Sequence, residues 1–511
     1  MMRLLANFSL LCLLATNGFA AETVTANVLS SITSADLRRH AERLADDTLE
    51  GREAGSRGGQ AAGHYLGREF QRHELAGGAA TRSYYQLFGS QYRNILGLLE
   101  GSDPQLKNDV ILVGAHYDHV GYGNSQNSFG PTGFIHNGAD DNASGVAGLL
   151  ELVEAFSRLE SRPKRSILFA FWDGEEKGLL GSEHWVAHPT VPLDRVRLAI
   201  NLDMIGRLQR NRVETFGIRS GYGLRRLIGV SNAATDLLFD FSWTMREDSD
   251  HYSFYKRNVP VIMFHTGLHS DYHRPSDDVE KLDFAGMERI VRLLFGVIRE
   301  AADQPRSYGF RAASRGETDN SRQQREQPLP DLPNRFGVVW DTADEGLGTG
   351  LRIVKVTAGS AAARAGVRVG DRLARFAGRE VSSGAELRGL VLAAKNPVTI
   401  SLERPGNDKP VDLTVQLAGQ PTRLGIWWRI DDAEPQAVIV SRVVPGSPAA
   451  QAGIQVNDRL YEVFGKSFTG DAEFRRLISD VDAEMLDFLT ERQGRVRTVS
   501  VKLLPPVGSE F

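Results

Sequence analysis

Between Tyr84 and Ala302, short and almost wholly apolar runs alternate with segments of helical periodicity. The apolar runs cover residues 109–115, 166–172, 197–202 and 259–264, and the helical segments cover 146–156 and 284–298. Strands that are buried on both faces read as continuous apolar runs, and their alternation with helices is typical of a sheet covered by helices. The sequence therefore predicts an α/β fold with a mixed central sheet and helices on both faces.

The first twenty residues have the pattern of a secretory signal peptide. Arg3 supplies the positive start, residues 4–14 an apolar core that is too short to span a bilayer, and residues 18–20 a small-x-small cleavage site. Cys12 is the only cysteine and lies within this segment, in a context that does not favour a lipoprotein signal. The mature chain would then lack both disulfides and thiolate metal ligands. We therefore expect an exported protein of the bacterial periplasm or the extracellular medium.

Bulk properties limit the partners of the chain. Its 511 residues suffice for two to four domains, and its net charge of −4 gives no reason to expect nucleic acid or an anionic membrane surface as a partner. No stable membrane span is expected either, because the apolar core at 4–14 is too short. Residues 34–75 have helical periodicity interrupted by a predicted exposed turn at 48–53. Residues 303–333 are rich in polar residues and proline, which predicts a flexible linker. The linker would follow a first domain that covers residues 21–302.

An internal repeat follows this predicted linker. The word at 356–373, which contains Gly-Ser-x-Ala and ends in Asp-Arg-Leu, returns 87 residues later at 443–460. A period of this length is too long for a solenoid and indicates a duplicated small domain. We place the two β-rich copies at 334–420 and 421–506. Each copy opens with an apolar-Gly-apolar step, at 336–338 and 424–426.

Polar clusters follow the predicted strands of the first domain. The carboxyl ends of parallel strands meet at one edge of a sheet, so we expect the side chains that follow them to converge there. These side chains are His116, Glu175, Glu176 and Asp203, with Asp140 and His273 in neighbouring clusters. Histidine and carboxylate ligands without cysteine favour a hydrolytic zinc site over a structural one.

Each cluster also has a simpler interpretation. The two glutamates could form a charged loop that ends a strand. The run at 140–142 could cap the following helix, with Asn142 as the N-cap. Asp118 lies two residues after His116, on the same side of an extended segment, and could orient its imidazole.

The combination of these words resembles the co-catalytic di-zinc aminopeptidases of the zinc exopeptidase clan. The matching segments are 114–118, 137–145, 173–178, 201–204 and 272–277. The resemblance covers roughly residues 35 to 302. It implies two Zn²⁺ per chain, with His116 and Asp203 on one ion, Glu176 and His273 on the other, and Asp140 bridging both. It also implies the roles of the two adjacent glutamates, with Glu175 as the general base.

The resemblance implies metal-assisted hydrolysis of peptides. Two zinc ions would activate a water and polarise the scissile carbonyl, and Glu175 would carry the proton to the leaving amine. Residues 249–251 resemble a family segment that supports the site. Some family members have a tyrosine just upstream as an oxyanion donor, whereas this chain has Arg246 and Glu247 in that region.

The C-terminal copies resemble PDZ domains attached to exported bacterial proteases. Such domains bind peptide carboxyl termini by strand addition, with the apolar-Gly-apolar loop holding the carboxylate. One or both copies could instead serve only in packing or dimerisation.

The leading hypothesis is an exported zinc aminopeptidase that acts on peptide or protein substrates. Carboxypeptidase, dipeptidase or glutaminyl cyclase activity on the same fold is a close alternative. A non-catalytic peptide-binding scaffold is a third hypothesis, and it would be expected to lack a ligand or the base.

Overall fold

The computed structural model describes residues 28–330, 334–344, 350–479 and 484–505. The predicted signal peptide at 1–20 lies outside these residues. The chain falls into two compact units, Met1–Arg322 with Gln493–Arg495, and Gln323–Arg492 with Val496–Phe511. None of the helices in the described ranges combines the length and the hydropathy that a bilayer crossing requires.

One nine-stranded sheet forms the centre of the first unit, with strand order β1-β3-β5-β4-β6-β9-β7-β8 and β2 paired with β3. Its central strands run parallel: β5 (Ser166–Trp172), β4 (Val110–His116), β6 (Val196–Leu202) and β9 (Val261–His265). β3 (Tyr92–Leu99) and β7 (Arg212–Phe216) join this block antiparallel. The short strands are β1 (Ala76–Gly77), β2 (Tyr85–Phe88) and β8 (Leu238–Phe241). The predicted mixed sheet is confirmed.

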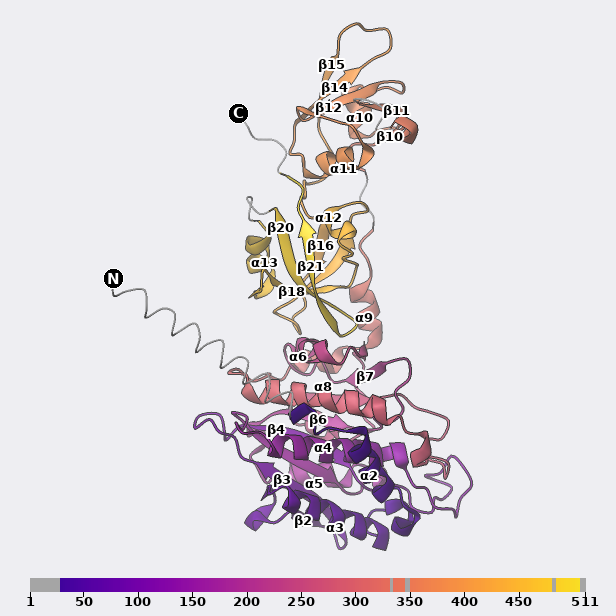
Figure 1. Ribbon diagram of the computed structural model, residues 1–511, viewed down its shortest axis with the longest axis vertical. Coiled ribbons are helices and arrows are strands. Elements are labelled where there is room, and N and C mark those ends of the chain that lie inside the picture. The colour runs from indigo at the N-terminus through magenta and orange to yellow at the C-terminus, as the bar shows by residue number, and fades with distance from the viewer. Residues whose placement is uncertain (1–27, 331–333, 345–349, 480–483, 506–511) are drawn as a thin grey trace, which may run out of the picture. The chain divides into compact units, whose positions relative to one another are not determined.

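Two separate apolar cores lie against this sheet. The helices that contribute to them are drawn as ribbons in Figure 1. The larger core includes residues of α2 (Ser34–Leu44), α3 (Arg57–Arg72), α4 (Gly145–Ser157), α6 (Leu224–Ser231) and α8 (Phe284–Asp303). The smaller core packs α5 (Leu180–Ala187) and α7 (His251–Tyr255) around Trp172, Trp185 and Phe254. Along β5, Phe169 and Phe171 belong to the larger core and Leu168 and Ala170 to the smaller one, because successive side chains of a strand point to opposite faces.

The prediction of an exposed turn at 48–53 was wrong. A tight turn at Asp47–Arg52 buries Arg52, whose side chain is among the largest fully buried ones. Its guanidinium donates to the carbonyl oxygens of Leu44, Tyr117, Asn137 and Gly138. Four carbonyl acceptors satisfy the buried donors, so Arg52 ties together the loops that follow β4 and precede α4.

The prediction of a flexible linker at 303–333 was wrong over much of its length. A 3₁₀ turn at Ala312–Gly316 and helix α9 (Asp319–Glu326) are both ordered. Glu317 pairs with Arg219 at 2.6 Å and with Arg311 at 2.9 Å. Multiple charge-assisted hydrogen bonds hold this segment where few apolar side chains are available, and a composition argument does not detect them.

The second unit contains two six-stranded antiparallel sheets. The first comprises β10 (Val338–Trp340), β11 (Leu351–Val356), β12 (Arg372–Phe376), β13 (Arg379–Glu380), β14 (Val398–Glu403) and β15 (Val411–Val415), with helices α10 (Ala361–Ala365) and α11 (Gly384–Ala393). The second comprises β16 (Ile426–Arg429), β17 (Val438–Val443), β18 (Arg459–Val463), β19 (Lys466–Ser467), β20 (Met485–Arg492) and β21 (Arg495–Lys502), with α12 (Pro448–Gln451) and α13 (Gly470–Ile478). The predicted pair of β-rich modules is confirmed.

The repeated sequence word has a structural cause. Ser360 caps α10 and Ser447 caps α12, each accepting a hydrogen bond from a backbone N–H. Gly337 and Gly425 have φ of +87° and +86°, and a Cβ at either position would lie 2.2 Å from the Cβ of that serine. Only glycine fits at this step, which explains why both copies open with apolar-Gly-apolar.

Candidate metal centre

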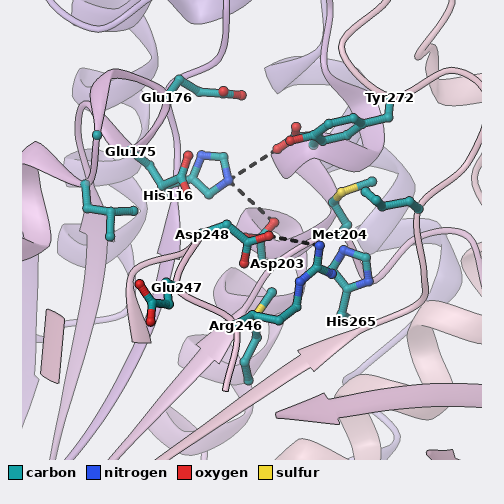
Figure 2. A pocket seen from close by; sticks show the side chains of 15 residues that line it. His116, Glu175, Glu176, Asp203, Met204, Arg246, Glu247, Asp248, His265 and Tyr272 are labelled. Atoms are coloured by element: carbon teal, nitrogen blue, oxygen red, sulfur yellow. Dashed lines mark ion pairs between the residues drawn. The ribbon is translucent and has the colours of Figure 1, made fainter. Parts of the chain in front are cut away.

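The carboxyl ends of the parallel strands border a cavity of about 290 Å³ (Figure 2). His116 ends β4, Glu175 and Glu176 form a turn just after β5, and Asp203 directly follows β6. Asp141 and Tyr272 enter from the loops that precede α4 and follow β9. The structure thus brings His116, Glu175, Glu176 and Asp203 together, as the strand-end argument predicts.

Asp141, and not Asp140, faces this cavity, so the prediction of Asp140 as the bridging ligand was wrong by one residue. The Asp140 carboxylate is fully buried and accepts hydrogen bonds from the Gly206 N–H at 2.7 Å and from Ser144 Oγ at 3.0 Å. Its other oxygen lies 3.1 Å from His269 Nε2. Through these contacts the Asp140 carboxylate connects neighbouring loops of the protein. Asp141 is therefore the carboxylate that is available for a metal.

One oxygen of Asp141 belongs to a first group of ligand atoms. Asp141 Oδ1 lies 3.3 Å from His116 Nε2, which is 3.5 Å from Asp203 Oδ1. His116 Nδ1 lies 3.2 Å from the backbone carbonyl of Asp118, so Nδ1 carries the proton and the Nε2 lone pair faces the two carboxylates. Ser249 Oγ donates to Asp203 Oδ2 and fixes its orientation.

The other oxygen of Asp141 belongs to a second group. Asp141 Oδ2 lies 3.1 Å from His273 Nε2, and Glu176 Oε2 lies 3.2 Å from the same nitrogen. His273 Nδ1 lies 2.9 Å from the carbonyl oxygen of Asn127, which assigns the ring proton to Nδ1. His273 Nε2 is buried and, among the described residues, makes no hydrogen bond. A buried nitrogen lone pair between two carboxylates fits a divalent metal ion.

Asp118 supports the site in a way that the sequence did not indicate. Its carboxylate oxygen Oδ1 is 3.9 Å from His116 Nδ1, and the closer contact of that imidazole is with the Asp118 backbone carbonyl. The carboxylate instead accepts from the backbone N–H groups of Glu175 at 3.1 Å and Glu176 at 3.4 Å. Asp118 therefore orients both the histidine and the two glutamates.

The electrostatic environment of the cluster shifts the pKa values of its carboxyl groups in opposite directions. Burial raises the pKa of Glu175 well above its usual range, and the nearby Glu176 and Asp203 raise it further, although His116 opposes this. Burial would also raise the pKa of Asp141, but the imidazoles of His116 and His273 hold it well below its usual range. Carboxyl groups of one site whose pKa values diverge, as those of Glu175 and Asp141 do, are typical of sites in which different residues bind metal and transfer protons.

Several supporting residues were missed from the sequence. His119 lies 2.7 Å from Glu176, and Asp277 Oδ2 accepts from the backbone N–H groups of Asp140 and Asp141. His119 lies three residues after His116, within the segment Gly114 to His119, but nothing in its spacing distinguished a ligand from a support. Asp277 ends a segment that resembled the family, which was the one available signal.

The outer wall of the cavity carries both charged and apolar side chains. Arg246 pairs with Asp248 at 2.9 Å, as drawn in Figure 2, and Glu247 lies next to them. Met204, Met263 and Leu268 supply apolar surface. Arg246 is the only lysine or arginine that lines this cavity within the described part of the chain.

A second cavity, of about 500 Å³, is lined mainly by the first PDZ-like module, and Trp427, Val444 and Pro445 of the second module complete its wall. Its walls include β10 residues Val338 and Trp340 and α11 residues Leu387, Val391 and Leu392. This groove is mainly apolar. The predicted carboxylate loop borders it, but the N–H groups of Phe336 and Gly337 both donate to Asn334 Oδ1 at 3.0 Å.

Histidines and carboxylates at the ends of parallel strands are typical of a hydrolytic metal centre. Residues 94–298 match the model of Peptidase family M28, and residues 323–417 and 439–486 each match a PDZ domain model. The chain therefore carries an M28 peptidase domain followed by two PDZ domains, and the family resemblance inferred from the sequence is confirmed.

The chain is similar to several named peptidases. It is 29% identical over 219 residues to Aminopeptidase YwaD of Bacillus subtilis (strain 168), covering 41% of this chain and 44% of that protein. It is 29% identical over 175 residues to Leupeptin-inactivating enzyme 1 of Streptomyces exfoliatus, covering 34% and 36%. The aminopeptidase LapA of Legionella pneumophila aligns with a TM-score of 0.47 at 21% identity, over 56% of this chain and 75% of that structure. The chain thus spans less than half the length of the two curated relatives.

Proposed function

We propose that this protein is a zinc-dependent aminopeptidase that removes N-terminal residues from peptides. The observation that carries the proposal is the division of the two Asp141 oxygens between two groups of ligand atoms. Each oxygen of Asp141 lies near one histidine and one further carboxylate. A central carboxylate with such a pair on each side is the arrangement that two metal ions require. The M28 match is consistent with zinc as the metal.

His116 and Asp203 would hold one zinc ion, Glu176 and His273 the other, and Asp141 would bridge them. When bound, the pair of ions would supply Lewis-acid polarisation of the scissile carbonyl and a lowered pKa for an attacking water. The protein prepares for this by fixing both imidazoles with their Nε2 lone pairs toward the carboxylates.

Glu175 would act as the general base. Its carboxylate lines the cavity beside His116, while Asp118 holds its backbone N–H. The carboxylate would accept a proton from water and deliver it to the nitrogen of the leaving amine. Burial raises the pKa of Glu175, whereas two nearby zinc ions would lower it.

The charges around the cavity favour a substrate ammonium over a substrate carboxylate. Six carboxylates line it: Asp141, Glu175, Glu176, Asp203, Glu247 and Asp248. Two zinc ions would offset the first four, and Asp248 is paired with Arg246. One acidic side chain then remains in excess and no unpaired lysine or arginine lines the wall in the described residues, which argues against carboxypeptidase activity.

A substrate panel tests the direction of cleavage. Aminoacyl chromogens with a free amino terminus are compared with their N-acetylated forms, and peptides with free carboxyl termini with their amides. We expect N-acetylation to lower kcat/KM by a factor on the order of 10² or more, because the acidic wall loses its cationic partner. Equal cleavage of N-acetylated peptides, with loss of activity on amidation, would instead make the enzyme a carboxypeptidase.

The PDZ groove supports a second role, the capture of peptide segments with apolar C-terminal residues. Export to the periplasm or medium is part of the same proposal, and it rests on the sequence of residues 1–20. Fractionation of cells that express the full chain, followed by N-terminal sequencing of the processed protein, tests the export.

A further inference from the structure

His119 lies beside the second group of ligand atoms, although the ligand set described above does not include it. Its ring is buried, and Nδ1 lies 2.7 Å from Glu176 Oε1. The opposite oxygen, Glu176 Oε2, lies 3.2 Å from His273 Nε2. The two oxygens of Glu176 thus face two different histidines.

We propose that His119 is a positioning residue, which holds Oε1 of Glu176 so that Oε2 is presented to a metal ion together with His273 and Asp141. This inference rests on the proposed two-zinc function. It assigns to His119 a role that is distinct from that of the histidines whose Nε2 atoms face the carboxylates.

The direct alternative is that His119 is itself a ligand. Ligand atoms of His119, Asp141, Glu176 and His273 all lie within 4.8 Å of one another, so distance alone permits it. The hydrogen bonding favours positioning. The lone pair of His119 lies on Nε2, which is buried and has no hydrogen-bond partner among the described residues, whereas Nδ1 is at hydrogen-bond distance from a carboxylate oxygen and carries the proton. The ring atom that faces Glu176 is thus the protonated one. Its distance to Asp141 Oδ2, the shared ligand oxygen, is longer, at 3.9 Å.

The surroundings of His119 fix its ring. A Cβ at Gly138 would lie 2.5 Å from His119 Cδ2, so the ring packs directly on the Gly138 backbone, where φ is +55°. The Gly138 carbonyl accepts from Arg52, and the Arg52 carbonyl accepts from the His119 N–H at 3.3 Å. Backbone and ring are therefore both anchored, as a residue that orients a metal ligand requires.

Zinc binding by the full-length protein tests this role independently of turnover. Chelator-stripped wild type and the variants H119A, H119N and H119Q are titrated with zinc against a chromophoric chelator. An asparagine amide can take the place of Nδ1–H, whereas a glutamine amide takes the place of Nε2. We expect H119A and H119Q to weaken one zinc site by about 10- to 100-fold, H119N to restore it to within about threefold, and the other site to be unchanged.

Three outcomes would overturn the proposal. Wild-type affinity of H119A at both sites would leave His119 without a role. Equal losses in H119N and H119A, with a changed visible spectrum of the cobalt-substituted protein, would make His119 a ligand. If H119A does not fold, the comparison of H119N with H119Q decides, and equal affinities would contradict positioning.

A matched control uses another buried histidine of the same region. His136 contacts Ser128 Oγ and the Phe134 carbonyl, and within the described residues no hydrogen bond or ion pair joins its side chain to the ligand groups. H136N is expected to bind two zinc ions with wild-type affinity. Fewer than two zinc ions in the wild type would refute the proposed function itself, whatever the His119 variants do.

Discussion

The acidic cavity of the peptidase unit and the apolar groove lined by the two PDZ modules differ in how their side chains are fixed before a ligand binds. In the cavity, several groups have a defined partner, such as Asp118 for the backbone N–H of Glu175 and Ser249 for the carboxylate of Asp203. In the groove, apolar side chains of β10 and α11 form much of the wall, and the N–H groups of the predicted carboxylate loop already donate to Asn334.

This difference indicates a division of labour. Preorganised polar groups are what a reaction with developing charge requires, because reorientation during the reaction costs rate. An apolar groove beside a strand suits the capture of a peptide, in which backbone hydrogen bonds and side-chain burial supply affinity. If the division holds, variants in one region leave the measured property of the other unchanged.

The largest effect is expected from E175Q. This variant keeps the shape of the side chain but removes its basicity, so kcat on an aminoacyl chromogen should fall by about 10²- to 10⁴-fold. Zinc content and peptide binding by the PDZ modules should stay at wild-type values. Near-wild-type turnover in E175Q would show that another group is the base.

A smaller effect, confined to peptide binding, is expected from L392E. Leu392 is a half-buried residue that lines the groove, so a charge there should weaken binding of a peptide with an apolar C-terminal residue by about tenfold or more. V369E is the control, because Val369 is 65% exposed and lies outside the groove. Fluorescence anisotropy gives the affinities. Equal losses in both variants would argue that the groove is not the binding surface.

The smallest effect is expected from N334A, and it has the opposite sign. Removal of the Asn334 oxygen frees the N–H groups of Phe336 and Gly337 for a ligand carboxylate. A hydrogen bond contributes a net 0.5–1.5 kcal/mol, so affinity should rise by roughly two- to tenfold for a free carboxyl terminus and remain constant for the amide. Weaker binding with an unchanged melting temperature would mean that Asn334 belongs to the binding surface.

Most of the peptidase fold could be predicted from the sequence, because strands that are buried on both faces appear as continuous apolar runs. The apolar run at 166–172 coincides with β5, and that at 197–202 falls within β6. The segment at 303–333 was misjudged because its order comes from Glu317 and its two arginine partners, which lie apart in the sequence.

The sequence predicted which loops form the site, but it did not always predict which residue of a loop faces the cavity. Asp140 and Asp141 are adjacent, and only the contacts of Asp140 with Ser144, Gly206 and His269 reveal which carboxylate remains for the cavity. The spacing of Asp118 and His116 indicated their contact, but the contact of Asp118 with the two glutamates was out of reach, because it depends on backbone N–H groups of a distant turn.

Zinc stoichiometry of the wild type, D141N and D140N tests the two-metal centre most directly. Elemental analysis of the dialysed, folded proteins should give two zinc ions for the wild type and for D140N, because Asp140 contacts only protein groups. D141N should lose at least one zinc ion, since both groups of ligand atoms share the Asp141 carboxylate. Two zinc ions in D141N, together with a loss in D140N, would contradict the account.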